Sequence, residues 1–354
     1  TWAGPGVELA NRPRPRIPAM QQPSVAGKAQ LAIRAAGGKV RRTKRGSTAM
    51  RILILGAGGV GGYFGGRLAA AGVDVTFLVR PRRAALLAAH GLVLKSPLGD
   101  LTQQVKTVTA DTVRPGYDAI IMSCKAYDLE DAIAAIRPAS EGALILPQLN
   151  GMAHLDRLDA EFGRDRVLGG VAGIAVTLTA DGEVHHLNKL ATLVTGPRSP
   201  AAEAKCAALA VELAKGGFDF RNSTDIVQDM WEKWVFLCSL AAMCCLMRGR
   251  VSQIVGSSTA GAELMLEMLD DCAAAATAAG HAPRDAHRSN TRKQLSDPNG
   301  QWEASMLRDV RAGNRVEADH VVGDMLARAV AAGRPATLLK AAYAHLKIYE
   351  SSLG

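Results

Sequence analysis

The sequence predicts an α/β protein in which a Rossmann-type doubly wound sheet forms the N-terminal domain and an all-α domain follows it. Three observations lead to this fold class. Short β-rich runs alternate with helical stretches from Met50 onward, a glycine-rich loop follows the first run, and no convincing strand pattern occurs after residue 222. With 354 residues and 48% apolar content, the chain is long enough for two domains that each have a core.

The N-terminal domain, residues 50–222, is expected to begin with four strand–helix repeats. Each strand run is rich in aliphatic residues, and the run after it has helical spacing. The predicted pairs are 51–56 with 60–72, 74–79 with 82–91, 118–125 with 126–136, and 143–147 with 151–163.

Three further β-rich segments and one helix complete the predicted domain. Residues 169–180, 182–188 and 191–197 are expected to add to the same sheet as antiparallel strands, and residues 199–216 to form a helix. His185 and His186 alternate across one of these strands, so they cannot chelate an ion together and are interpreted as surface residues.

The C-terminal domain, residues 223–354, is predicted to be helical throughout. Several N-cap candidates stand at 222–225, ahead of the first helix. Loops with turn residues at 280–285, 296–301 and 331–336 separate the later helical patterns.

The basic charge of the chain belongs to its first 49 residues. The net charge is +9, but this segment holds ten of the 42 Lys/Arg and one of the 33 acidic residues, so residues 50–354 are balanced. It also holds five of the 15 prolines. Residues 1–49 are interpreted as a disordered basic leader or as an upstream or cloning-derived extension. The balanced remainder argues against nucleic acid or a membrane surface as a partner.

The cysteines and the longest apolar run exclude two further classes of protein. The six cysteines form no CxxC pair and no metal-ligand spacing, so no metal site is expected, and free buried thiols fit a cytoplasmic protein. Between Lys233 and Arg248, Ser239 is the one residue outside the apolar set. At about 1.5 Å per residue this run falls short of a hydrocarbon layer of about 30 Å, so a core helix is expected.

A glycine-rich loop follows the first predicted strand and opens the first predicted helix. The pattern Gly56-x-Gly58-x-x-Gly61 permits a tight turn, close approach to a pyrophosphate and close packing of helix on strand. The cofactor site is therefore expected to comprise Gly56, Ala57, Gly58, Gly59, Val60 and Gly61. The alternative is a glycine-rich helix-packing motif.

The end of the second predicted strand favours NADPH over NADH. An NAD site usually has an acidic residue there, whereas this chain has Arg80, followed by Arg82 and Arg83. A guanidinium group suits a 2′-phosphate. For Arg82 and Arg83, a solvated basic loop remains the alternative.

Five stretches give the chain a resemblance to the ketopantoate reductase (2-dehydropantoate 2-reductase) family over nearly all of residues 50–354. In chain order they read RILILGAGGVGGYFGGRLA, SCKAYDLEDAI, LPQLNGM, DMWEKWVF and SMLRDVRAGNRVEADHVVGDMLARA. The resemblance implies a Rossmann domain, a helical domain, and reduction of a 2-oxo acid with NADPH at the cleft between them. The small-molecule 2-oxo acid is then the expected partner, and a homodimer is compatible with this interpretation.

The resemblance also implies roles for individual residues. Lys233 matches the catalytic lysine, Glu317 an acidic residue near substrate and cofactor, and Ser305 a substrate-binding serine. Asn150 matches an asparagine of the cleft that serves both ligands, and Lys125, like Arg80, matches a cofactor contact. The chemistry agrees, because hydride transfer to a ketone leaves an alkoxide that needs a proton or a positive field. The alternative for Lys233 is a lysine that snorkels from the end of a core helix.

The chain departs from the family at two positions that bear on substrate. Most members have asparagines four and eight residues after the lysine, where this chain has Leu237 and Ala241. Arg248 is a candidate replacement if the helix breaks there, because a straight helix would place it about 22 Å from Lys233. The expected function is reduction of ketopantoate to pantoate for coenzyme A synthesis. The alternatives are another branched 2-oxo acid as substrate, or a non-catalytic NADP(H)-binding regulator.

Overall fold

The structure is a computed structural model that describes residues 49–353. The interpretation of residues 1–49 as a leader therefore falls, apart from Ala49, outside the described residues. The description below concerns the compact unit that begins at Thr48.

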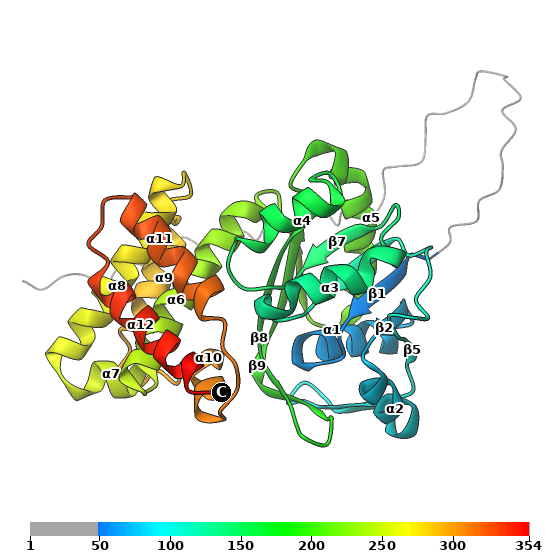
Figure 1. Cartoon of the computed structure of the whole chain (residues 1–354), viewed down its shortest axis with the longest axis horizontal. Coiled ribbons are helices and arrows are strands. Elements are labelled where there is room, and N and C mark those ends of the chain that lie inside the picture. Colours follow the sequence, from blue (N-terminus) through cyan, green and yellow to red (C-terminus); the bar gives the residue numbers. More distant parts are fainter. Residues whose placement is uncertain (1–48, 354) are drawn as a thin grey trace, which may run out of the picture. The chain divides into compact units, whose positions relative to one another are not determined.

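The first sheet is parallel and doubly wound, as predicted (Figure 1). Its strand order is β5-β2-β1-β6-β7, and every neighbouring pair is parallel. The direction of winding reverses between β1 and β6, and ligands of such sheets bind beside the carboxyl ends of strands at this point. The strands are β1 (Arg51–Leu55), β2 (Asp74–Leu78), β5 (Lys106–Val108), β6 (Ala119–Met122) and β7 (Leu144–Pro147).

Helices connect these strands close to the predicted positions. Their apolar faces bury Phe64, Ile133 and Leu158 against the sheet. The helices are α1 (Gly59–Ala70), α2 (Pro81–His90), α3 (Leu129–Ile136), which follows the short turn η1 (Ala126–Asp128) and precedes η2 (Arg137–Ala139), and α4 (His154–Phe162).

The prediction that three further segments add antiparallel strands to this sheet is wrong. They form a second sheet of order β10-β9-β3-β4, with β8 paired antiparallel to β9. Residues 182–188 and 191–197 belong mostly to one long strand, β9. This strand pairs with β3 near its start and with β10 near its end. The strands are β3 (Leu92–Lys95), β4 (Leu101–Gln103), β8 (Gly169–Leu178), β9 (Val184–Gly196) and β10 (Asp219–Asn222).

His186 is also a correction to the sequence interpretation. Its ring is buried, and its nitrogens lie 2.9 Å from the Ser96 hydroxyl and 2.9 Å from the Leu190 carbonyl oxygen. The Tyr63 ring of α1 lies 4.7 Å from the His186 ring and covers this face of β9, which the alternation pattern alone could not reveal.

The helix predicted at 199–216 is present, with single turns at both ends. The turn η3 (Pro200–Ala202) leads into α5 (Glu203–Leu213), and η4 (Ala214–Gly216) ends it.

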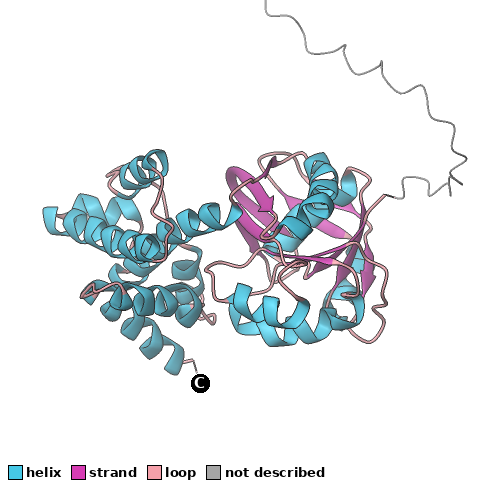
Figure 2. Cartoon of the chain, turned by 90° about the horizontal axis from the view of Figure 1, so that it is seen from above, coloured by secondary structure: helices cyan, strands magenta, loops and turns pink. Residues whose placement is uncertain are grey.

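The part of the described chain that follows β10 is helical, as predicted (Figure 2). The Asp225 carboxylate accepts a hydrogen bond from the Gln228 backbone N–H and caps the first helix. The helices are α6 (Ile226–Met247), α7 (Val251–Ser257), α8 (Thr259–Ala278), α9 (Asp285–Leu295), α10 (Ser305–Arg311), the π-helix η5 (Ala318–Gly323), α11 (Asp324–Ala331) and α12 (Thr337–Ser351).

Helix α6 is a core helix, although it is long enough to span a membrane. The helix has 22 residues and is longer than the apolar run identified in the sequence. Its length therefore does not exclude a membrane span. Burial shows that α6 belongs to the core, because 72% of its most apolar 18-residue stretch is buried inside the protein. One hydrophobic cluster includes Trp231 and Trp234 of α6 together with Ile145 of β7.

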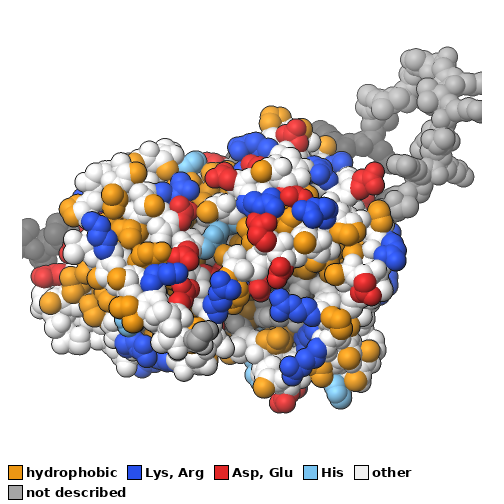
Figure 3. Space-filling model, viewed as in Figure 1, with side chains coloured by type: hydrophobic (Ala, Val, Ile, Leu, Met, Phe, Trp, Pro, Cys, Tyr) orange, Lys and Arg blue, Asp and Glu red, His pale blue; other side chains and the backbone are white. Residues whose placement is uncertain are grey.

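The surface of the described chain carries both signs of charge. In Figure 3, basic and acidic side chains are interspersed over the visible face. This agrees with the balanced charge of residues 50–354.

Candidate active site

The glycine loop has the geometry of a phosphate site at the start of α1. Gly56 has φ +92°, a conformation that favours glycine. A Cβ on Gly61 would lie 2.3 Å from the Gly56 carbonyl oxygen and from the Ser123 hydroxyl, so this position must be glycine for α1 to pack. A Cβ on Gly58 would meet nothing within 4 Å, and the first turn of α1 has no acidic residue. The loop is therefore open to an anion over Gly58.

The neighbouring residues of the loop complete this description. Ala57 is buried, and its carbonyl points to α2, where it accepts a hydrogen bond. Gly59 and Val60 form the first turn of α1, and a Cβ on Gly59 would touch the Val176 side chain of β8 at 3.0 Å. Strand β8 therefore closes one side of the loop.

Arg80 and Arg83 have different environments. Arg80 follows β2, its side chain is 79% exposed, and its guanidinium lies 3.7 Å from the Asp128 carboxylate. Arg83 is half-buried and donates to the carbonyl oxygens of Ala57 (2.8 Å) and Gly182 (2.7 Å). Arg83 thus fixes the phosphate loop and the β8–β9 turn, while the exposed side chain of Arg80 is accessible to a ligand. Arg82 is exposed.

Glu317 joins the loop after β6 to the helical part of the chain. Its carboxylate is buried, accepts the Ala126 backbone N–H at 3.0 Å, and lies 3.5 Å from Nζ of Lys125. Lys125 also pairs with Asp309 of α10 at 3.0 Å. Burial lowers the pKa of Lys125, but attraction by Glu317 and Asp309 outweighs burial, so the pKa lies above its usual value. Lys125 remains a fixed positive charge.

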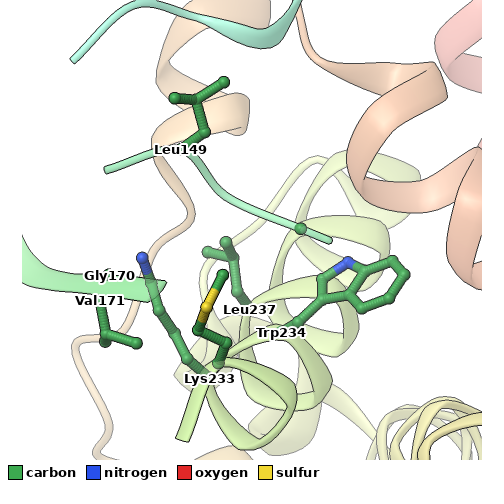
Figure 4. Close-up of a pocket in the computed structure, with 8 residues that line it drawn as sticks. Leu149, Gly170, Val171, Lys233, Trp234 and Leu237 are labelled. Carbon is green, nitrogen blue, oxygen red and sulfur yellow. The ribbon is translucent and has the colours of Figure 1, made fainter. Parts of the chain in front are cut away.

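Lys233 lies in the second turn of α6 and extends away from the helix. Figure 4 shows its amino group beside Gly170 and Val171 of β8, with Leu237 between Lys233 and the Trp234 ring in this view. The cavity there has a volume of about 10 Å³, the space of about one water molecule. Its walls are formed by Leu149, Gly151, Gly170, Val171, Met230, Lys233, Trp234 and Leu237.

The electrostatic surroundings prepare Lys233 to exchange a proton. Burial lowers the pKa of Lys233 to about 8, and the Glu317 carboxylate opposes this shift. The adjacent Glu232 does not compensate Lys233, because it is buried in an ion pair with Arg284. No described residue forms an ion pair or hydrogen bond with Nζ of Lys233. An amine with a pKa close to neutrality can act as an acid at physiological pH.

A second, larger cavity has Glu317 in its wall. It has a volume of about 400 Å³, which is the size of a small-molecule site. Residues from the loop after β6, from the start of α4 and from η5 form its walls, and they include Ala126, Tyr127, Ala153, Arg315, Glu317 and His320.

The structure brings Asn150 to this region. Asn150 lies between Leu149 and Gly151, which both line the Lys233 cavity. Gly151 has φ +75°, and a Cβ there would lie 2.9 Å from the His320 carbonyl oxygen. This segment therefore packs directly on η5, the helix that begins after Glu317.

Ser305 and Arg248 do not line the cavity beside Lys233. Ser305 is the first residue of α10, is half-buried, and makes no side-chain hydrogen bond to a described residue. Arg248 is exposed at the far end of α6, which is unbroken between Lys233 and Met247, so the two residues are about 22 Å apart along the axis. The helix break that would bring Arg248 to the substrate does not occur.

The sequence interpretation missed several residues of this region. His154 of α4 and His320 of η5 lie 3.2 Å apart between ring nitrogens, and burial is the main cause that lowers the pKa of His154 to about 3. Gln148 is buried with both amide atoms unpaired among the described residues. No local pattern marks these side chains, because each depends on a distant segment. Asp309 and Arg311 of α10 form ion pairs with Lys125 and Glu303 respectively.

Comparison with known proteins identifies the family of the chain. Residues 52–200 match the family model of ketopantoate reductase PanE/ApbA, and residues 225–350 match its C-terminal model. The chain is 31% identical over 303 residues to the uncharacterized oxidoreductase YkpB of Bacillus subtilis, covering 85% of this chain and 99% of that protein. It is 25% identical to the 2-dehydropantoate 2-reductase of Pyrococcus abyssi, covering 82% and 95%.

Solved structures agree with this assignment. The PanE/ApbA family ketopantoate reductase of Ralstonia eutropha aligns with a TM-score of 0.76 and 26% identity, covering 86% of this chain and 99% of that one. A D-mandelate dehydrogenase aligns with a TM-score of 0.77 at 19% identity over 86% and 99% of the two chains, which shows a shared fold. The glycine loop at the sheet's switch point, the lysine of α6 and both family models agree, and the chain belongs to the ketopantoate reductase family.

Proposed function

We propose that this protein is a cytoplasmic, NADPH-dependent reductase that converts ketopantoate to pantoate in the route to coenzyme A. The observation that carries the proposal is Lys233, an amine whose pKa is lowered to about 8 in a small apolar cavity within electrostatic range of Glu317. A protein that only binds NADP(H) has no need of such a group. The six free cysteines are in keeping with a reducing compartment.

The residues present fit a nicotinamide dinucleotide. The open loop over Gly58 and the amino end of α1 would hold the pyrophosphate, and Arg80 would meet the 2′-phosphate. Lys125, which stays cationic beside Glu317, adds positive charge at the carboxyl end of β6. When bound, the cofactor would supply the hydride.

Lys233 would supply the proton that completes the reduction. As the ketone carbon gains a hydride, its oxygen becomes an alkoxide, and an ammonium group at that oxygen stabilises the charge and then protonates it. The apolar walls formed by Leu149, Val171 and Leu237 exclude water and strengthen this interaction. Glu317 keeps the pKa of Lys233 high enough for the amine to be protonated near neutral pH.

The second candidate is a reductase for another branched or bulky 2-oxo acid. Leu237 favours it, because Leu237 lines the Lys233 cavity where most family members have an asparagine. The neighbour D-mandelate dehydrogenase, solved with NADH and anilino(oxo)acetate, indicates that this fold accommodates such ligands. In either case the substrate carboxylate would rest on Asn150, Ser305, backbone N–H groups and Lys233.

A panel assay distinguishes these candidates. Purified protein is incubated with NADPH or NADH and with ketopantoate, its straight-chain and branched analogues, and aryl 2-oxo acids, while cofactor oxidation is followed. Highest kcat/KM for ketopantoate with NADPH supports the first candidate. Highest kcat/KM for a bulkier acid supports the second. Cofactor binding without any turnover would favour a regulator and refute both.

A further inference from the structure

Gln148 is a buried polar side chain without a partner. It is 7% exposed, and neither Nε2 nor Oε1 forms a hydrogen bond within residues 49–353. Within that range no other residue leaves two buried side-chain polar atoms unpaired. Buried amides are normally paired, and an unpaired one lowers stability unless a ligand completes it.

The position of Gln148 is that of a cofactor contact. It directly follows β7, and its backbone N–H donates to the carbonyl of Met122, the last residue of β6, at 2.8 Å. The side chain therefore begins at the carboxyl ends of the two strands beyond the switch point, where a doubly wound sheet binds its ligand.

Gly170 connects Gln148 to the Lys233 cavity. A Cβ on Gly170 would lie 2.7 Å from Nε2 of Gln148, and Gly170 also forms part of the cavity wall beside the amino group of Lys233 (Figure 4). Any larger residue at 170 would displace the amide. The unpaired amide and the proton-donating amine are thus both neighbours of Gly170.

The two unpaired atoms of Gln148, the donor Nε2 and the acceptor Oε1, indicate which chemical group of a ligand binds there. A carboxylate would satisfy Nε2 and leave Oε1 without a donor, whereas a primary carboxamide accepts from Nε2 and donates to Oε1. The nicotinamide ring carries a primary carboxamide, and the ring must lie close to Lys233 because both act on the same carbonyl group. We propose that Gln148 hydrogen-bonds the carboxamide of the nicotinamide ring and sets which ring face meets the substrate. This inference rests on the proposed nicotinamide-dependent function.

The proposal predicts opposite effects on binding and on stability. Replacing Gln148 by methionine, which has a similar length, removes both polar atoms. Cofactor affinity should fall because two hydrogen bonds are lost. The cofactor-free protein should become more stable, with a Tm about 2 °C higher, because two unpaired buried atoms are removed. A glutamine with a purely structural role would lower the Tm when replaced.

The test compares two cofactors and needs no substrate. Dissociation constants are measured for NADPH and for its 3-acetylpyridine analogue, in which a methyl group replaces the amide nitrogen. We expect the wild-type protein to prefer NADPH, and Gln148→Met to bind NADPH roughly tenfold more weakly and to lose that preference. Binding of 2′,5′-ADP should not change. Gln104→Met, at an exposed glutamine, is the matched control, and Gln148→Leu repeats the test with a second side chain.

The possible results of this experiment test the role of Gln148 independently of the proposed function. An unchanged cofactor preference in Gln148→Met and Gln148→Leu would overturn the role of Gln148, even if 2-oxo acids are reduced normally. Loss of 2′,5′-ADP binding in both variants would overturn it as well, because the effect would then act through the fold. A preference that disappears in the variants would support it, even if the wild-type protein reduced no 2-oxo acid in the panel.

Discussion

Glu317 lies 3.5 Å from Nζ of Lys125, and its second carboxylate oxygen accepts the Ala126 backbone N–H. A buried acid of the helical domain is thereby attached to the loop that follows β6. The same carboxylate raises the pKa of Lys233 against the effect of burial. One carboxylate thus influences a permanently charged lysine and a second lysine that can release its proton, and this arrangement leads to the predictions below.

Lys233→Ala should lower kcat for 2-oxo acid reduction by about 10²–10⁴-fold, the range for loss of a general acid. NADPH affinity should change little, because the phosphate loop and Arg80 lie on the other domain. In the wild-type protein, kcat should be level below pH 8 and fall roughly tenfold per pH unit above it, as Lys233 with a pKa of about 8 loses its proton. Turnover close to wild type in the variant would return Lys233 to the role of a snorkelling core lysine.

Glu317→Gln should move this pH profile to lower pH. The carboxylate raises the pKa of Lys233, so its removal leaves burial unopposed and the amine deprotonates earlier. Asp309→Asn is the matched control, since Asp309 pairs with Lys125 but does not shift the pKa of Lys233. A profile that moves equally in both variants would show that Glu317 has no specific effect on Lys233.

Arg80→Ala and Arg83→Ala should have different signatures in cofactor binding. Arg80→Ala should weaken NADPH binding by roughly 1.5–3 kcal/mol, the range of a hydrogen bond to a charged group, and leave NADH unaffected. Arg83→Ala should weaken both cofactors equally and lower the Tm, because Arg83 holds the Ala57 and Gly182 carbonyls. Isothermal titration with each cofactor measures this. Equal losses of NADPH and NADH in Arg80→Ala would contradict the assignment of the 2′-phosphate.

Leu237→Asn should change the substrate preference towards ketopantoate. Leu237 lines the Lys233 cavity, so an amide there could pair with polar groups of the substrate and raise kcat/KM up to about tenfold relative to bulky acids. Ala241 is 1% exposed and does not line this cavity, so Ala241→Asn should instead cost about 1–3 kcal/mol of stability. If the two variants have the same substrate profile, position 237 does not set specificity.

Arg248→Leu should leave KM for every 2-oxo acid unchanged. Its exposed side chain lies at the C-terminal end of an unbroken α6, where a cation is favoured by the helix dipole. Steady-state kinetics would contradict this if KM rose tenfold or more, which would require a second substrate contact at that end of the helix.

The sequence alone predicted the parts of the protein that depend on local patterns. The parallel sheet followed from alternating apolar runs, the phosphate loop from the spacing of Gly56, Gly58 and Gly61, and the helical half from helical spacing. Each of these features depends on residues that are close together in the sequence, so a short stretch of the sequence is enough to predict it. The resemblance to ketopantoate reductases extended this prediction to Lys233, Glu317 and Asn150, whose positions near one another the structure describes.

Tertiary structure decided the features that depend on distant segments. Strand β9 joins a second sheet because β3 and β10 pair with it. Arg83 is a structural residue because Gly182, 99 positions away, accepts its hydrogen bond. The unbroken α6 separates Arg248 from Lys233. Burial also depends on every segment that packs on a residue, so only the folded chain could show that the Gln148 amide is buried without a partner among the described residues.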